Sequence, residues 1–298
     1  MFLKKIFLKI FNKDLYYNLK NEEKLQEEIS LFKSKTNLEI KLIRKNIEKK
    51  EISFLHSGHL GDILYSLPVI KELSKNKKCN LYIEKNFKIS SFYFKHPGNE
   101  FFLNKKMTNM LMPLLKSQPY LNEVDIYNNH SIDINLNIFR KLPIDLAYTS
   151  RIFFQLTGIH SDLRKKYIFA KKKSIFKNKI VLLRSFRYRN YFINYNFLKN
   201  YDNIIFIGLY DEYLDLKKVI NKLTFYECKN FSEMAEIINS CKLFIGNQSF
   251  GYALAEGLKT PRLLENFPRK SYVYPAGKKA YDFFFQEDFV NFFNKLNK

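Results

Sequence analysis

One stretch of the chain, residues 57–68, constrains the possible fold more than any other. It reads Ser-Gly-His-Leu-Gly-Asp-Ile-Leu-Tyr-Ser-Leu-Pro. The apolar residues 52–55 before it predict a buried strand, and the amphipathic residues 63–73 predict a helix. A strand, a glycine-containing turn and a helix are typical of an open α/β sheet, which binds ligands at the carboxyl edge of its strands. We therefore expect a functional site at this turn.

Four residues of the turn are candidates for that site. Gly58 and Gly61 have no Cβ, so a substrate can come close to the backbone there. Asp62 carries a carboxylate at the edge of this opening and is a candidate general base. His59 is a candidate to line the opening, although a packing role explains it, and the nearby His56, equally well.

Strands and helices alternate from Glu51 onward. The expected strands cover residues 52–56, 80–84, 123–127, 132–136, 179–183, 203–208, 224–226, 242–246 and 262–265. The expected helices cover residues 62–74, 101–115, 145–156, 212–222, 230–240 and 251–258. Such alternation predicts parallel sheets. The lysine-rich residues 161–178 predict a linker, so we expect two Rossmann-like domains, residues 51–160 and 179–280, that face a cleft.

The C-terminal residues 281–298 form a separate segment in this scheme. Residues 281–296 predict a helix with a stripe of phenylalanines at positions 283, 284, 289, 292 and 293. This stripe indicates core or interdomain packing rather than a ligand site. We expect the helix to pack back across the domains.

Residues 1–50 form a helical extension of a different character. Apolar residues at positions 2, 3, 6, 7, 10 and 11 share one helix face, and lysines at 4, 5, 9 and 13 lie elsewhere. This pattern is typical of a basic amphipathic helix in a membrane interface. A helix that packs against the rest of the protein, or against a partner subunit, is the alternative. Residues 21–50 are charged, with few apolar positions, and predict a solvated helix or pair of helices that acts as a spacer.

The composition bears on partners and compartment. The 51 Lys and Arg exceed the 29 Asp and Glu, and the formal net charge of +22 favours phosphate-bearing partners. A low-GC genome, which favours lysine over arginine, explains the excess of positive charge equally well. Cys79, Cys228 and Cys241 are too few and too widely spaced for a disulfide framework or a zinc site, which fits a reducing cytoplasm. No apolar run approaches the roughly 20 residues that span a bilayer.

Residues 241–257 predict a second strand, polar turn and helix. The start of a helix carries partial positive charge and binds phosphate readily. Asn247, Gln248 and Ser249 add side-chain donors, and Gly251 follows them in the helix. These four residues are candidates for donor binding. The alternative is an ordinary helix cap, because Asn and Ser are good capping residues.

Three arginines follow the first strand of the second series. Arg184, Arg187 and Arg189 offer planar, permanently charged groups that suit phosphate oxygens. A solvated loop is one alternative, and stacking on single-stranded nucleic acid is another, because aromatic residues alternate with the arginines. Glu212 begins a later helix at the same sheet edge. It is a candidate to bind ribose hydroxyls, or it complements the helix dipole.

Two of these stretches resemble signatures of one enzyme family. Residues 58–62, Gly-His-Leu-Gly-Asp, followed by Leu-Pro at 67–68, are similar to the G-x-x-G-D signature of heptosyltransferase-type glycosyltransferases of family 9, which have the GT-B fold. Residues 231–238 and 241–249 are similar to the helix, strand and loop that hold the diphosphate of a nucleotide-sugar in that family. The resemblance covers residues 51–275 in layout.

The resemblance implies roles for single residues. It implies that Asp62 is the catalytic base, that Arg187 and Arg189 lie near the phosphates, and that Glu212 binds the ribose. The chain departs from the family at residues 248–250, Gln-Ser-Phe, where the family usually has Asp-Thr-Gly. Residues 1–50 have no counterpart in the family.

The resemblance also implies an activity. This is inverting transfer of a sugar from a nucleotide-sugar to a saccharide or lipid-linked acceptor in cell-envelope glycan synthesis, such as that of lipopolysaccharide. No metal or further cofactor is implied, because cationic side chains can neutralise the leaving diphosphate. We expect a cytoplasmic protein, held on the inner face of the cytoplasmic membrane if residues 1–13 bind it.

Other classes of function stay open. They are an inactive GT-B scaffold or sugar-binding module, a sugar-nucleotide epimerase, and a basic nucleic-acid-binding protein. The last gives no reason for Gly58, Gly61 and Asp62, so no nucleic-acid partner is expected.

Overall fold

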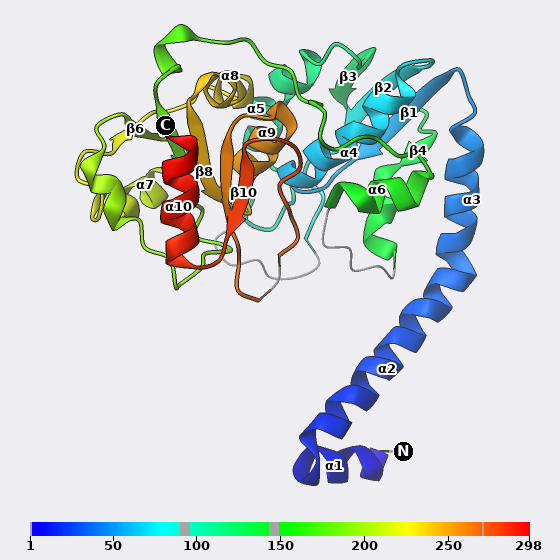
Figure 1. The fold of residues 1–298 in the computed structure, drawn as a ribbon. Coiled ribbons are helices and arrows are strands. Elements are labelled where there is room, and N and C mark those ends of the chain that lie inside the picture. The colour runs from blue at the N-terminus through cyan, green and yellow to red at the C-terminus, as the bar shows by residue number, and fades with distance from the viewer. Residues whose placement is uncertain (1, 90–95, 143–148, 270) are drawn as a thin grey trace.

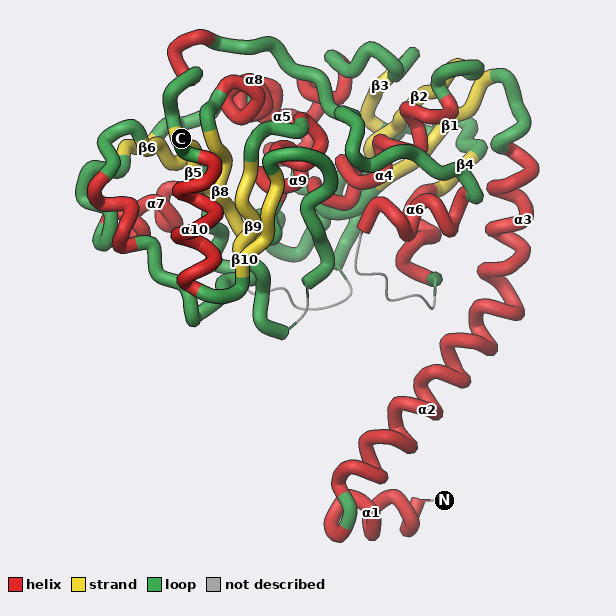
Figure 2. Tube along the Cα trace, viewed as in Figure 1, coloured by secondary structure: helices red, strands yellow, loops and turns green. Residues whose placement is uncertain are grey.

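The molecule consists of two α/β halves and a helical arm (Figure 1). The computed structural model describes residues 2–89, 96–142, 149–269 and 271–298. Figure 2 shows strands only in the two halves, whereas the arm is helical apart from the turn between its first two helices. The expected α/β class with parallel sheets is confirmed.

The first half contains a four-stranded parallel sheet in the order β3-β2-β1-β4. Its strands are β1 (Glu51–His56), β2 (Lys78–Ile83), β3 (Glu123–Ile126) and β4 (Ile134–Asn135). Its helices are α4 (Leu60–Leu73), α5 (Lys105–Lys116), the 3-10 helix η2 (Leu136–Lys141) and α6 (Thr149–Thr157). The central strand β1 buries Ile52 and Phe54 completely. The helix expected from residue 101 begins four residues later, after the cap Asn104. Of the helix expected over 145–156, the first four residues lie outside the described residues.

The second half contains a six-stranded parallel sheet in the order β10-β9-β8-β5-β6-β7. Its strands are β5 (Ile180–Leu183), β6 (Ile204–Phe206), β7 (Thr224–Phe225), β8 (Leu243–Asn247), β9 (Arg262–Glu265) and β10 (Ala280–Phe283). Its helices are α7 (Tyr210–Lys217), α8 (Phe231–Ser240), α9 (Phe250–Leu258), α10 (Gln286–Leu296) and the 3-10 helices η3 (Ser174–Phe176) and η4 (Asn196–Asn200).

The C-terminal segment differs from the expectation. The prediction that a helix begins at residue 281 is wrong. Residues 280–283 form strand β10, which pairs with β9, and the helix α10 begins at Gln286. The packing role of the phenylalanines is confirmed: Phe283, Phe289 and Phe293 are buried, and the first two rings stack 4.1 Å apart. The core that they join lies wholly in the second half, where α10 packs on β9 and β10.

The two halves share a hydrophobic core. Helix α4 packs against α9 and α5 against α8, and one cluster of buried side chains includes Leu67 of α4 and Leu254 of α9. Residues 161–178 pack on both halves. The Tyr167 N–H donates to the Gly257 carbonyl, and the Tyr167 carbonyl accepts from the Tyr120 hydroxyl. The carboxyl edges of the two sheets are therefore held in a fixed relation.

The arm consists of α1 (Phe2–Phe11), α2 (Lys13–Leu31), the π-helical turn η1 (Phe32–Thr36) and α3 (Asn37–Asn46). Helix α3 joins the arm to the first half through the buried Ile40 and Ile43, and Arg44 donates to the Gln155 carbonyl. The helical character expected of residues 1–50 is confirmed. No helix among the described residues is long and apolar enough to cross a membrane.

Candidate active site

Asp62 lies in the first turn of α4, at the carboxyl edge of β1. Its carboxylate accepts the backbone N–H of His59, and its Oδ2 is 3.3 Å from Nη2 of Arg140. The side chain is 21% exposed. Burial raises the pKa of this carboxyl above its ordinary value, although the positive charge of Arg140 acts in the opposite direction. A carboxylate with a raised pKa is a stronger base than an ordinary one.

Arg140 reaches Asp62 from η2, which follows β4, the neighbour of β1. Its guanidinium lies over the ring of Phe102, at 4.5 Å, and over that of Phe139, at 4.4 Å. Its Nη1 donates to Oδ1 of Asn137, at 3.1 Å. These contacts from three sides fix the guanidinium beside the carboxylate.

The two glycines of the turn serve different purposes. A Cβ at Gly58 would lie 2.3 Å from Nη2 of Arg140 and 2.6 Å from Cε1 of His56, so glycine is required there. At Gly61 the nearest atom, on Tyr65, would be 3.9 Å away. Gly58 therefore admits the protein's own guanidinium, and only Gly61 borders open space.

The histidines at this edge are neutral near pH 7. Burial lowers the pKa of His59 to about 3 and that of His96 to about 4. Nδ1 of His96 accepts the Gly98 N–H, so its Nε2 carries the hydrogen and donates to Nδ1 of His59 at 2.9 Å. His56 is fully buried and accepts the Gly58 N–H, which is the packing role considered for it.

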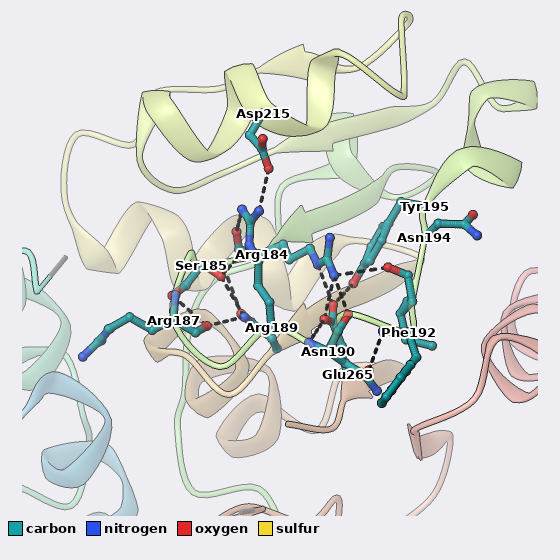
Figure 3. Close-up of polar contacts among 12 residues, drawn as sticks. Arg184, Ser185, Arg187, Arg189, Asn190, Phe192, Asn194, Tyr195, Asp215 and Glu265 are labelled. Carbon is teal, nitrogen blue, oxygen red and sulfur yellow. Dashed lines mark hydrogen bonds and ion pairs between the residues drawn. The ribbon is translucent and has the colours of Figure 1, made fainter. Parts of the chain in front are cut away.

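Arg184 and Arg189 are not placed as phosphate ligands (Figure 3). Arg184 is 12% exposed and forms a two-pronged pair with Glu265, at 2.7 and 2.8 Å. Arg189 pairs with Asp215 at 2.5 Å and also donates to backbone carbonyls of its own loop. Both arginines stabilise the loop after β5 and leave little of their charge for a ligand. The same contacts engage two of the three arginines that, with the aromatic residues between them, suggested nucleic acid.

Arg187 behaves differently from the other two. Its loop is tightly folded: Nδ2 of Asn247 donates to the carbonyls of Ser185 and Arg187, and Tyr188 adopts φ 58°. The Arg187 side chain extends away from the Arg184–Glu265 pair, toward the pale blue ribbon of the first half (Figure 3). It comes close enough to lower the pKa of His59 and Asp62. The two halves therefore bring Asp62 and Arg187 to one site.

The remaining donor-side candidates take structural roles. Glu212 is 5% exposed and accepts the Phe186 N–H at 3.1 Å, and burial raises its pKa. Asn247 is fully buried in the loop contacts described above. Gln248 accepts the Tyr272 N–H at 2.7 Å.

The start of α9 is an ordinary capped helix end. Ser249 caps the helix by accepting the Tyr252 N–H. Gly251 allows close packing, because a Cβ there would lie 2.5 Å from Cδ1 of Leu183. The positive end of α9 is thus present at the sheet edge, but the expected side-chain donors around it are largely engaged.

Sequence reasoning missed Arg140, Asn137 and His96. Arg140 and Asn137 follow an expected strand, at the same sheet edge as Asp62, and this position is the one signal that could have found them. His96 has no local signal, because it comes from a loop between β2 and α5.

Two further features of the described residues concern metal ions and cavities. No three His, Cys, Asp or Glu side chains gather there as ligands for a metal ion. A cavity of about 600 Å³ lies where α5 meets the start of α8, and its lining includes Lys105, Lys106 and Lys229. None of the expected site residues lines it.

Known structures resemble this fold. A glycosyl transferase of family 9 from Veillonella parvula DSM 2008 has a TM-score of 0.54 at 11% identity, over 85% of this chain and 90% of that chain. E. coli ADP-heptose lps heptosyltransferase II has a TM-score of 0.50 at 10% identity, over 83% and 98%. The E. coli heptosyltransferase WaaC with ADP has a TM-score of 0.50 at 12% identity, over 83% and 100%.

The chain has the GT-B fold of the family 9 glycosyltransferases. This confirms the fold that the two motifs implied. No family model and no curated protein matches the sequence. In this GT-B fold, Asp62 lies at the edge of one sheet and Arg187 at the facing edge of the other.

Proposed function

We propose that the protein is an inverting glycosyltransferase that moves a sugar from a nucleotide-sugar to a saccharide or lipid-linked acceptor in cell-envelope glycan synthesis, at the inner face of the cytoplasmic membrane. One observation carries the proposal. Burial raises the pKa of the partly buried Asp62 carboxylate, and the positive charge of Arg187, which comes from the other half, acts on this carboxylate. A base and a cation at facing edges are what a displacement with an anionic leaving group needs.

The reaction assigns a task to each group. The acceptor hydroxyl loses its proton to Asp62 as its oxygen attacks the anomeric carbon. The bond from that carbon to the diphosphate breaks on the opposite face, which inverts the configuration. Arg187 and the positive end of α9 stabilise the negative charge that develops on the departing nucleoside diphosphate. The proposal assigns this neutralisation to the protein and requires no metal, so a chelator leaves turnover unchanged.

The similar structures suggest the first donor to test. Two of them are heptosyltransferases: one is named an ADP-heptose lps heptosyltransferase, and the other is described with ADP. A thermal-shift screen against ADP-, UDP-, GDP- and CMP-linked sugars is expected to give a shift with one nucleotide series, with ADP-heptose tested first. Transfer is then measured as acceptor-dependent release of the nucleoside diphosphate. No shift with any nucleotide-sugar would refute the proposal.

A second candidate is an inactive GT-B scaffold that binds a nucleotide-sugar. The engagement of Arg184, Arg189 and Asn247 within the protein favours it, because fewer groups remain for the diphosphate. The same pair of assays separates the two. The scaffold gives a thermal shift with no release, whereas the enzyme gives both.

A further inference from the structure

The tip of the arm lies apart from the two halves (Figure 1). No residue of α2 is buried. Helix α1 folds back on α2 at Asn12, with Leu8 only 8% exposed, and Lys5 pairs with Glu23 of α2. The arm itself is firmly held at its other end, where Ile43 is buried and Lys141 pairs with Glu39 of α3. The fold therefore carries α1 at the end of a fixed helical stalk.

One face of α1 is apolar and uncovered. Ile6 is 43% exposed, Phe7 59%, Ile10 65% and Phe11 71%. The rings of Phe7 and Phe11 lie 4.6 Å apart and form one aromatic patch. Contiguous exposed apolar residues of this kind mark an interaction surface.

The charge around this face identifies its partner. Residues 1–13 contain four lysines and no acidic residue. Lys9 and Lys13 lie exposed beside the apolar face. A helix with an aromatic apolar face and a lysine-bearing polar face lies in the headgroup region of a bilayer that contains anionic lipids. We propose that α1 is an anchor for an anionic membrane surface and that α2 is the stalk that holds the body away from it.

A second copy of the chain fits this face less well. A two-fold pairing of α1 would bring six lysines together with no acid from α1. A stable protein interface buries about 800 Å² and about 20 residues on each side, whereas α1 is 10 residues long. Leu25 and Leu31 of α2 do not form a second stripe, because they are six positions apart and lie on different helix faces.

The stalk sets the height of the candidate active site. Helix α2 has 19 residues and is therefore about 28 Å long. Resting on the proposed function, this height suits an acceptor whose reacting sugar stands well above the lipid headgroups. It is a poor fit for an acceptor hydroxyl at the membrane surface.

The test is flotation of the full chain with vesicles of phosphatidylcholine, with and without phosphatidylglycerol. We expect flotation with the anionic vesicles. The double variant Phe7→Ser/Phe11→Ser is expected to bind them at least about tenfold more weakly, because two aromatic side chains no longer enter the interface. Lys9→Gln/Lys13→Gln is expected to lower the affinity for vesicles about fivefold for each charge removed, and only for the anionic vesicles.

The matched control is Leu38→Ser/Leu42→Ser on α3, where the side chains are 65% and 58% exposed. It is expected to float like the unchanged chain. Equal flotation of Phe7→Ser/Phe11→Ser and the unchanged chain would overturn the proposal. So would a dimer in solution that this variant dissociates while vesicles bind nothing. Transfer to a soluble acceptor stays unchanged in Phe7→Ser/Phe11→Ser, so failure of the anchor and failure of the enzyme are distinguishable.

Discussion

The facing sheet edges of the two halves carry similar residues and use them differently. Asp62 and Glu212 both lie in the first turn of a helix that follows a strand. Asp62 is 21% exposed and pairs with Arg140, a side chain from a distant segment. Glu212 is 5% exposed and accepts backbone N–H groups, including that of Phe186. Position at a carboxyl edge alone therefore does not make an acidic residue a general base. Its hydrogen-bond partners and its exposure decide whether it can accept a proton from a substrate.

The arginines of the second half extend this contrast. Arg184 and Arg189 each have a carboxylate partner and carbonyls of their own loop, so their charge stabilises the loop. Arg187 has its guanidinium 5.7 Å from the Tyr188 ring and its charge acts on the first half. Of the three arginines, Arg184 and Arg189 therefore stabilise the loop, and Arg187 is the one that we propose for the ligand.

The largest expected effect separates the two acids. Asp62→Asn is expected to lower turnover by about 10²–10⁴-fold, because a general base contributes that much. Nucleotide binding, measured by thermal shift, is expected to persist. Glutamine keeps the shape of Glu212, and Glu212 takes no part in proton transfer. The turnover of Glu212→Gln is therefore expected to fall by far less than that of Asp62→Asn. Equal losses of turnover in the two variants would contradict the assignment of Asp62 as the base and of Glu212 as a structural residue.

Arg184→Met tests the structural role of the buried pair. Glu265 is fully buried and would lose its charged partner, which costs about 3–5 kcal/mol of the free energy of unfolding. Urea denaturation measures the loss. Arg184→Met/Glu265→Leu removes both charges and is expected to recover part of the loss, because the Tyr195 hydroxyl and the Asn190 N–H then lack the acceptor that Glu265 provides. A fully stable Arg184→Met that no longer binds nucleotide would instead make Arg184 a ligand.

Arg187→Gln is expected to show the opposite behaviour. Its free energy of unfolding is expected to stay within about 0.5 kcal/mol of that of the unchanged chain, as for other partly exposed residues outside buried ion pairs. Its kcat is expected to fall about 10²–10³-fold, the usual result of removing one group that stabilises developing charge. Single-turnover kinetics with saturating donor measures the change. An effect confined to stability would assign Arg187 to the loop, with Arg184 and Arg189.

The features that could be predicted from the sequence are the local ones. Apolar runs followed by polar turns predict β1 in one sheet and β8 in the other. The turn at residues 57–62 also predicts that Asp62 lies at the start of a helix. The contacts between the site residues and their partners carry no local sequence signal, because strand order brings together segments that are far apart in the chain. Arg140 is 78 residues from Asp62, and Glu265 is 81 from Arg184.

Local patterns also failed where tertiary pairing overrode them. The phenylalanines after residue 281 are compatible with a helix, yet the first of them belongs to β10, because pairing with β9 satisfies its backbone. Gly58 looked like space for a substrate and instead accommodates Arg140. In both cases the deciding neighbour comes from another part of the chain.

The smallest expected effect is a change of pH dependence. Arg140 lowers the pKa of Asp62, so its removal in Arg140→Met lets that pKa rise further. A base must be ionised to act, and the acid limb of kcat/KM is therefore expected to move to higher pH, with little change on the alkaline side. Arg140→Lys keeps the charge and should move the limb less. Arg164→Gln, which breaks an exposed pair with Asp162, serves as the control and should not move it. If the limb stayed in place in Arg140→Met, the titrating group would not be Asp62, and the assignment of the base would have to change.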